Sequence, residues 1–215
     1  MDGRRARGEA TRKRLMESAE RVFAEWGFAA ARVDEIARQA GINKRMLYLY
    51  YGDKEGIYRA VVAQNLQRLL QEVELVATDD WDDPVAQVAE TIRRYFYFLV
   101  HHDALIRLLQ LEMLNGGKGT GMAFEAWTSI GLNRLDGILE KGIKKGVFRP
   151  DVELNCLVMT VSTLCLGFVS RRPILESVFS DTEAGDVMEN SLQHILKMVF
   201  DGMLMVPSSL SKVQS

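Results

Sequence analysis

Apolar residues recur every three or four positions along most of this chain, which is the spacing of one face of an α-helix. Polar, glycine-containing and proline-containing breaks separate the periodic segments. The chain has only 4 prolines, and runs of β-branched residues are few. We therefore predict an all-α fold of about nine helices, at residues 11–26, 34–40, 44–50, 54–76, 84–100, 104–114, 123–145, 152–171 and 185–204.

The two shortest predicted helices, 34–40 and 44–50, flank a tight turn. Gly41 lies in the turn, where a left-handed backbone conformation suits glycine best, and Asn43 can cap the second helix through its side-chain oxygen. Helical spacing predicts one small core from Ile36, Ala40, Ile42 and Leu47, with Lys44, Arg45, Tyr48 and Tyr50 pointing outward. A helix, a glycine turn and a basic, aromatic helix form the helix-turn-helix pattern, whose second helix enters the DNA major groove.

Residues 10–62 resemble the N-terminal DNA-binding domain of TetR-family transcriptional regulators almost end to end. The residues that carry the resemblance are Ala19, Phe23, Gly27, Ile36, Ala37, Ala40, Gly41, Ile42, Leu47, Tyr48, Tyr50, Tyr51, Lys54, Glu55 and Ala60. These motifs cover about a quarter of the chain, and the rest matches the family only in helical layout. The expected organisation is a basic disordered arm at 1–9, a helix-turn-helix domain at 10–56, a ligand-binding and dimerisation domain at 57–206 and a polar tail at 207–215.

The resemblance implies which side chains touch double-stranded DNA. Lys44 and Arg45 fall where the family contacts base edges, and the phosphate positions are Asn43, Tyr48, Tyr50 and Lys54. Arg and Lys donate to guanine O6 and N7, while tyrosine hydroxyls and helix N-termini hold the backbone. Arg4 and Arg5 lie in the 1–9 segment, which is either a solvated tail or an arm that grips phosphates or the minor groove.

Four positions in this region depart from or qualify the family pattern. Arg45 stands where glycine is common, and Met46 where a small residue or threonine is common. Arg32 replaces the threonine that commonly caps the first helix of the motif and contacts a phosphate, so both roles are in doubt for it. Tyr51 stands where the family usually has a buried Phe, and we predict that it packs in the core. The operator sequence of a relative therefore does not transfer.

The resemblance also implies a sensor cavity in the C-terminal body. The candidate lining residues are Tyr95, Leu99, Leu109, Glu112, Met113, Phe124, Trp127 and Cys165. Aromatic residues and methionines at helical spacing are also typical of ordinary core. Because an unpaired buried carboxylate is unfavourable, Glu112 would meet either a cationic or hydroxyl-bearing ligand or a neighbouring side chain. In the expected mechanism a small apolar effector displaces the helix at 54–76 and releases a repressor from its operator.

The helices at 152–171 and 185–204 each carry an apolar stripe that suggests pairing with a second subunit. The stripe residues are Leu157, Val161, Leu164 and Phe168 in the first helix, and Met188, Leu192, Ile195 and Val199 in the second. The resemblance implies a four-helix interface, and two-fold homodimers are the commonest oligomers. Such a dimer would read a palindromic operator with half-sites about 34 Å apart or at a longer whole-turn spacing.

Charge is distributed unevenly along the chain. Residues 1–60 contain 13 Lys and Arg against 9 Asp and Glu, a net charge of +4, whereas the remainder has 14 against 20, a net charge of −6. This distribution suits a protein that touches DNA with one end only. Uneven surface charge without a partner is the alternative explanation.

The cysteines and apolar segments indicate a cytoplasmic protein without a membrane partner. Cys156 and Cys165 are nine residues apart in one predicted helix, on roughly opposite faces, so they cannot pair within it. Few cysteines, no apolar leader at the N-terminus and no membrane-length apolar run favour a reducing compartment. The longest apolar stretch, 154–169, is short for a membrane span.

Other functions find little support in the sequence. The glycines at 116–121 lack P-loop spacing, and the adjacent His101, His102 and Asp103 lack the i, i+4 spacing of helical metal ligands. We therefore predict no catalytic residue, no metal and no cofactor. The remaining alternative is a helical protein of this fold that acts as an adaptor or binds DNA without a ligand.

Overall fold

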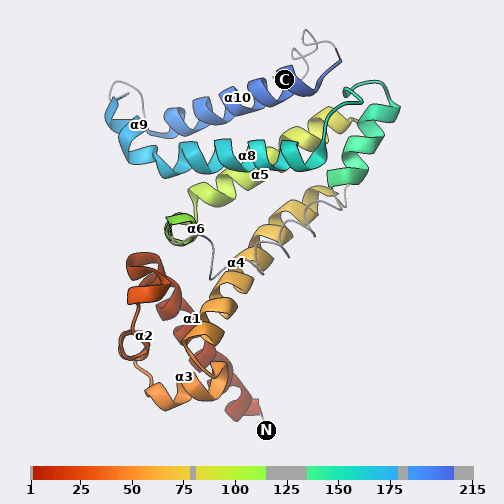
Figure 1. The fold of residues 1–215 in the computed structure, drawn as a ribbon. Helices are drawn as coiled ribbons and strands as arrows, with labels where there is room; N and C mark the ends of the chain where they lie inside the picture. The colour runs from red at the N-terminus through yellow and green to blue at the C-terminus, as the bar shows by residue number, and fades with distance from the viewer. Residues whose placement is uncertain (1, 78–80, 115–134, 179–183, 206–215) are drawn as a thin grey trace. The chain divides into compact units, whose positions relative to one another are not determined.

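The structure is a computed structural model that describes residues 2–77, 81–114, 135–178 and 184–205. The helices are α1 (Asp2–Ala30), α2 (Val33–Ala40), α3 (Lys44–Tyr51), α4 (Lys54–Ala77), α5 (Pro84–Val100), α6 (Asp103–Leu114), α8 (Leu154–Ser170), α9 (Arg172–Val178) and α10 (Ala184–Met203), with a further helical segment at 135–144 (Figure 1). The predicted all-α fold is confirmed. The pattern missed α9, because seven residues are too few to show a helical period.

The chain divides into two compact units. Unit 1 comprises residues 1–68 and 102–127, and unit 2 comprises residues 69–101 and 128–215. The helix α4 contributes its first part to unit 1 and its last part to unit 2 without a break. The functional domains expected at 10–56 and 57–206 stay a prediction.

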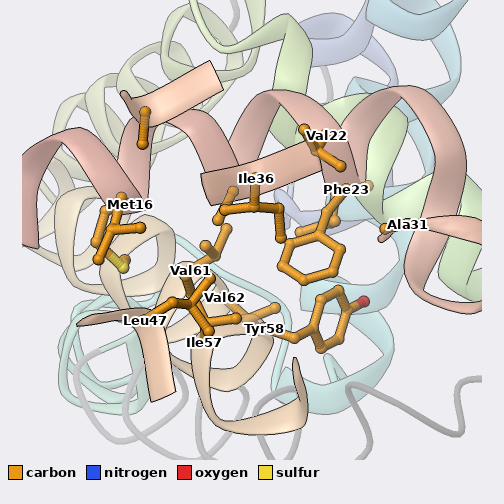
Figure 2. Packing of buried hydrophobic residues seen from close by; sticks show 14 residues of the cluster. Met16, Val22, Phe23, Ala31, Ile36, Leu47, Ile57, Tyr58, Val61 and Val62 are labelled. Carbon is orange, nitrogen blue, oxygen red and sulfur yellow. The ribbon is translucent and has the colours of Figure 1, made fainter. Parts of the chain in front are cut away.

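The core of unit 1 joins α1, α2, α3 and the start of α4. Ile36 and Leu47 are fully buried, as the helical spacing predicts, and Ile42 packs against them from the edge. Figure 2 shows Ile36 above the Phe23 ring, which meets the Tyr58 ring edge-on at 4.9 Å between centroids. The buried Ser18 hydroxyl donates to the Ile36 carbonyl at 2.8 Å, so a side chain of α1 holds the backbone of α2.

The first helix is longer than the sequence pattern predicts. It begins at Asp2, where a disordered arm was expected, and the Thr11 hydroxyl donates to the Arg7 carbonyl inside it. Alanine, arginine and glutamate in this segment are good helix formers and no proline interrupts them, which favours a helix there, while the arm expected at 1–9 stays a prediction. The predicted break at Gly27 is present, with φ 71° and ψ 170°, and one further turn reaches Ala30.

Unit 2 is built on α5, α8 and α10, which pack on one another (Figure 1). The predicted start of α5 is confirmed: Pro84 begins the helix, and the Asp83 side chain accepts a hydrogen bond from the Val85 amide at 2.8 Å. The most deeply buried side chains of this unit are Phe96, Leu99, Phe148, Cys165, Leu192, Ile195 and Phe200.

The stripe of α10 that was assigned to the dimer interface lies in this core instead. Met188, Leu192, Ile195 and Val199 are all at most 5% exposed in the single chain. Within the single chain, α5 and α8 already pack on α10. An apolar stripe predicts burial but does not specify the partner, so the role of these residues in a dimer stays a prediction.

The four stripe residues of α8 are half-buried, on the flank of the helix. Phe168 meets the ring of His194 on α10 at 6.4 Å between centroids. Within the described segments, no single helix is long and apolar enough to cross a membrane. The bent pair of α8 and α9, at 61°, meets that test only jointly and only by length and composition.

Candidate nucleic-acid interface

The turn between α2 and α3 has the geometry that the sequence predicts. Gly41 adopts the left-handed conformation, with φ 64° and ψ 37°, and the Ile42 amide donates to the Ala37 carbonyl at 3.0 Å. The Asn43 side chain then accepts from the Arg45 amide at 2.9 Å, which caps α3. This cap fixes the point at which α3 starts and therefore the direction in which its side chains leave the helix.

The helix α3 has one buried face and one solvent face. Leu47 is 0% exposed against the unit 1 core, whereas Tyr48 and Leu49 are 43% and 72% exposed. Arg45 is also exposed, and its position lies opposite Leu47 around the helix. The outward placement predicted for Arg45 and Tyr48 is confirmed. The sequence did not predict that Leu49 is exposed, because a leucine is usually buried and only the folded structure shows which residues surround it.

Lys44 already has a partner within the chain. Its ammonium lies 2.8 Å from an Asp34 carboxylate oxygen on α2 and 5.8 Å from the centre of the Tyr48 ring. The hydrogen bond to Asp34 raises the pKa of Lys44. Lys44 must therefore leave its solvent-exposed ion pair with Asp34 before its ammonium can bind a phosphate or a base.

The tyrosines at the end of α3 pack against α1. The Arg12 guanidinium lies 4.9 Å above the Tyr50 ring, and the Tyr51 hydroxyl donates to the Arg12 carbonyl at 3.5 Å. Burial raises the pKa of Tyr51, in keeping with its predicted place in the core. Tyr50 is partly buried, so less of its side chain is accessible to a phosphate than that of Tyr48. Arg12, which continues the basic N-terminal segment, thus adds a cation beside α3.

Lys54 points to the end of α1. Its ammonium donates to the Ala29 carbonyl at 3.1 Å and lies 4.8 Å from the centre of the Phe28 ring. Burial lowers the pKa of Lys54. In this structure Lys54 ties the first turn of α4 to α1, and the phosphate contact expected of it would use its remaining N–H donors.

The remaining predicted DNA contacts are basic residues outside α3. Arg32 precedes α2 with no capping hydrogen bond from its side chain, as its departure from the family pattern suggested. The side chains of Arg4 and Arg5 lie outside the described residues. Arg7, Lys13 and Arg14 are exposed on α1.

The expected ligand-pocket residues are divided between the units. Tyr95, Leu99 and Cys165 belong to unit 2, where Tyr95 forms a hydrogen bond with Ser162 on α8. Burial raises the pKa of Tyr95 far above its ordinary value and that of the Cys165 thiol to about 12. Leu109 is half-buried in unit 1. The side chains of Glu112, Met113, Phe124 and Trp127 lie outside the described residues, so the pocket stays a prediction.

Among the residues described, no three His, Cys, Asp or Glu side chains are grouped to hold a metal ion. His101, one of the two adjacent histidines, caps the C-terminus of α5. Its Nδ1 atom lies 2.6 Å from the Tyr97 carbonyl oxygen of the same helix.

Two segments of the chain match known protein families. Residues 15–61 match the family described as bacterial regulatory proteins, tetR family, and residues 84–199 match the family described as tetracyclin repressor-like, C-terminal domain. The HTH-type transcriptional repressor NicS of Pseudomonas putida is 27% identical over 178 residues, which are 81% of this chain and 82% of that protein. The HTH-type transcriptional regulator RutR of Escherichia coli is 24% identical over 202 residues, 93% of this chain and 94% of RutR.

Solved structures share the fold. A TetR family transcription regulator from Marinobacter aquaeolei has a TM-score of 0.73 at 21% identity, covering 93% of this chain and 98% of that one. The regulator FadR of Bacillus subtilis, solved in complex with stearoyl-CoA, has a TM-score of 0.71 at 22% identity, covering 88% of this chain and 98% of FadR.

Proposed function

This chain belongs to the TetR family of bacterial regulatory proteins, and we propose that it is a repressor that binds a palindromic operator as a homodimer and leaves it when a small apolar molecule binds. It is a DNA-binding transcriptional regulator and not an enzyme, as its family and relatives are. Repression is the activity named for NicS.

The observation that carries the DNA contact is the solvent face of α3. The helix is anchored by Leu47, capped by Asn43 and presents Arg45 outward without an intramolecular ion pair among the described contacts. A guanidinium held at that point can donate two hydrogen bonds to guanine O6 and N7 in the major groove. We expect Tyr48 beside it to contact a phosphate, and Lys44 to contact the DNA once it leaves Asp34.

Subunit pairing is proposed across the exposed sides of α8 and α10, beside the half-buried stripe of α8. Met159 and Met198 are each 50% exposed there, although both are large apolar side chains. His194 and Lys197 are exposed on the same helix as Met198. Two copies of such a face can bury their methionines against each other while the polar residues stay at the rim.

The effector is proposed to be apolar and to bind in the C-terminal body. We expect the half-buried Tyr95 and the buried Cys165 of unit 2 to contribute uncharged groups to its binding site, since burial raises the pKa of both. FadR, which shares the fold, was solved with stearoyl-CoA, a molecule with a long apolar chain. The helix α4 joins both units, so a ligand that shifts it favours one spacing of the two recognition helices over another.

The DNA contact is tested by binding of the purified protein to the DNA upstream of its own gene, titrated with salt. We expect a complex with two subunits per site, with log K falling steeply against log salt concentration. Arg45→Ala should weaken it at least 10-fold, while Arg107→Ala, which removes an exposed arginine from α6, should not. If Arg45→Ala binds as tightly as the wild type, Arg45 does not contact the DNA; if the wild type itself forms no sequence-preferring complex, the adaptor alternative is favoured.

The switch is tested separately, on the same complex at fixed salt. A panel of apolar molecules, including long-chain acyl-CoA and free fatty acids, is added to saturation. We expect at least one to lower operator affinity 5-fold or more, a coupling typical of allosteric regulators. An unchanged affinity throughout would leave the DNA-binding function in place and contradict induction by this class of molecule.

A further inference from the structure

Leu49 is exposed to an unusual degree for a leucine in the middle of a short, well-anchored helix. It is 72% exposed, more than the neighbouring Tyr48 at 43%, while Leu47 two residues earlier is fully buried. Leu49 follows Arg45 by four residues, so the two side chains lie one above the other on the same face of α3. That face points away from the unit 1 core. An apolar side chain thus shares the outward face with the arginine that we expect to read DNA.

The major groove offers one apolar feature for such a side chain, which is the 5-methyl group of thymine. We propose that Leu49 reads a thymine in each half-site by packing against this methyl group, next to the guanine read by Arg45. The proposal rests on the function proposed above, because it needs α3 in the major groove. It adds a residue and a base to that function.

The geometry of α3 limits where the thymine can lie. Four residues advance a helix by about 6 Å, and successive base pairs are about 3.4 Å apart. A helix that lies along the groove therefore places Leu49 and Arg45 over base pairs about two steps apart. Tyr48 and Lys44 lie on one flank of this face, next to each other, and supply polar groups for the phosphates.

The test replaces single thymines with deoxyuridine, which lacks only the methyl group. A duplex bound by the wild-type protein is first selected from a random library, and each thymine of one half-site is then replaced in turn. We expect the wild type to lose about 3- to 4-fold in affinity at one position, the value of one buried methyl group. Leu49→Ala should lose nothing further at that position, and Leu49→Met should keep part of the discrimination.

The matched control is Leu114→Ala, which removes another exposed leucine, 83% exposed at the end of α6. It should discriminate thymine from deoxyuridine like the wild type. Because Leu49 makes no contribution to the core, Leu49→Ala should also unfold at the wild-type temperature, so a loss of affinity does not reflect misfolding.

Each other outcome overturns the inference in a distinguishable way. If the wild type selects a sequence but no deoxyuridine substitution weakens it, the methyl contact is wrong while the DNA-binding function stands. If the same substitution weakens the wild type and Leu49→Ala equally, another residue contacts the methyl group. If the wild type selects no sequence at all, the proposed function fails together with the inference.

Discussion

Gly56→Ala should disrupt the junction between α3 and α4. Gly56 lies in the first turn of α4, and its amide donates to the Asp53 side chain at 2.6 Å. A Cβ atom at this position would lie 1.9 Å from the carbonyl oxygen of Tyr51, the last residue of α3. The opposing atom is backbone, so no change of side-chain rotamer relieves the clash.

The size of the effect follows from that distance. For the gap to open from 1.9 Å to 3.0 Å, the Tyr51 carbonyl must move by about 1.1 Å relative to α4. Overpacking in a protein core typically destabilises by about 1–3 kcal/mol, and a backbone clash this close belongs at the upper end. A loss of about 3 kcal/mol lowers the midpoint of thermal unfolding by about 6–12 °C in a chain of this size.

The assay is thermal unfolding followed by circular dichroism, together with operator binding at a temperature where the variant is folded. We expect DNA affinity to fall as well, since α3 ends at the displaced carbonyl. Gly137→Ala is the matched control: nothing lies within 4 Å of its Cβ position in the helical segment 135–144. It should stabilise by about 0.5–1 kcal/mol. A Gly56→Ala protein that melts within 1 °C of the wild type would show that the clash with the Tyr51 carbonyl does not destabilise the fold.

Three further predictions concern the cap of α3, the cysteines and a polar network of unit 2. Asn43→Ala removes the acceptor for the Arg45 amide and should destabilise by about 1 kcal/mol, measured by thermal unfolding, whereas Asn43→Asp should not. A thiol reagent at pH 8 should modify the exposed Cys156 at once and the buried Cys165, whose pKa is raised to about 12, only on unfolding; rapid reaction of two thiols would contradict this. Hydrogen bonds lower the pKa of Glu189, and the one donated by the Tyr97 hydroxyl has the largest effect. The stability that the ionised Glu189 contributes is therefore present above about pH 4.5 and is lost as the pH falls through the pKa of Glu189 in the folded protein. Glu189→Gln should therefore flatten the acid side of the stability profile below about pH 4.5, and unchanged steepness would argue against the network.

The parts of the fold that local chemistry determines were predicted from the sequence. The left-handed turn at Gly41, the cap at Asn43 and the start of α5 at Asp83 depend on residues within a few positions, and all three are confirmed. The register of α3, with Leu47 inward and Arg45 outward, follows from the helical period alone.

The rest depends on which distant residue meets which. The residues next to Lys44 in α3 do not predict its ion pair with Asp34 on α2. Likewise, Lys54 donates to the Ala29 carbonyl, which is 25 residues away in the sequence. The period of α10 predicts a buried stripe correctly, but only the packed structure shows that α5 and α8 of the same chain cover it. The exposure of Leu49 was not predicted for the same reason. A leucine side chain is expected to be buried, and only the folded structure shows that this one is exposed.

The central claim is that α3 enters the major groove of two half-sites, and methylation interference tests it most directly. Methyl groups are placed on guanine N7, which faces the major groove, and bound DNA is separated from free DNA. We expect N7 methylation to block binding at two clusters of guanines separated by about one helical turn or a whole number of turns, and Arg45→Ala to remove this interference. Sequence-selective binding that tolerates methylation at every N7 would contradict it.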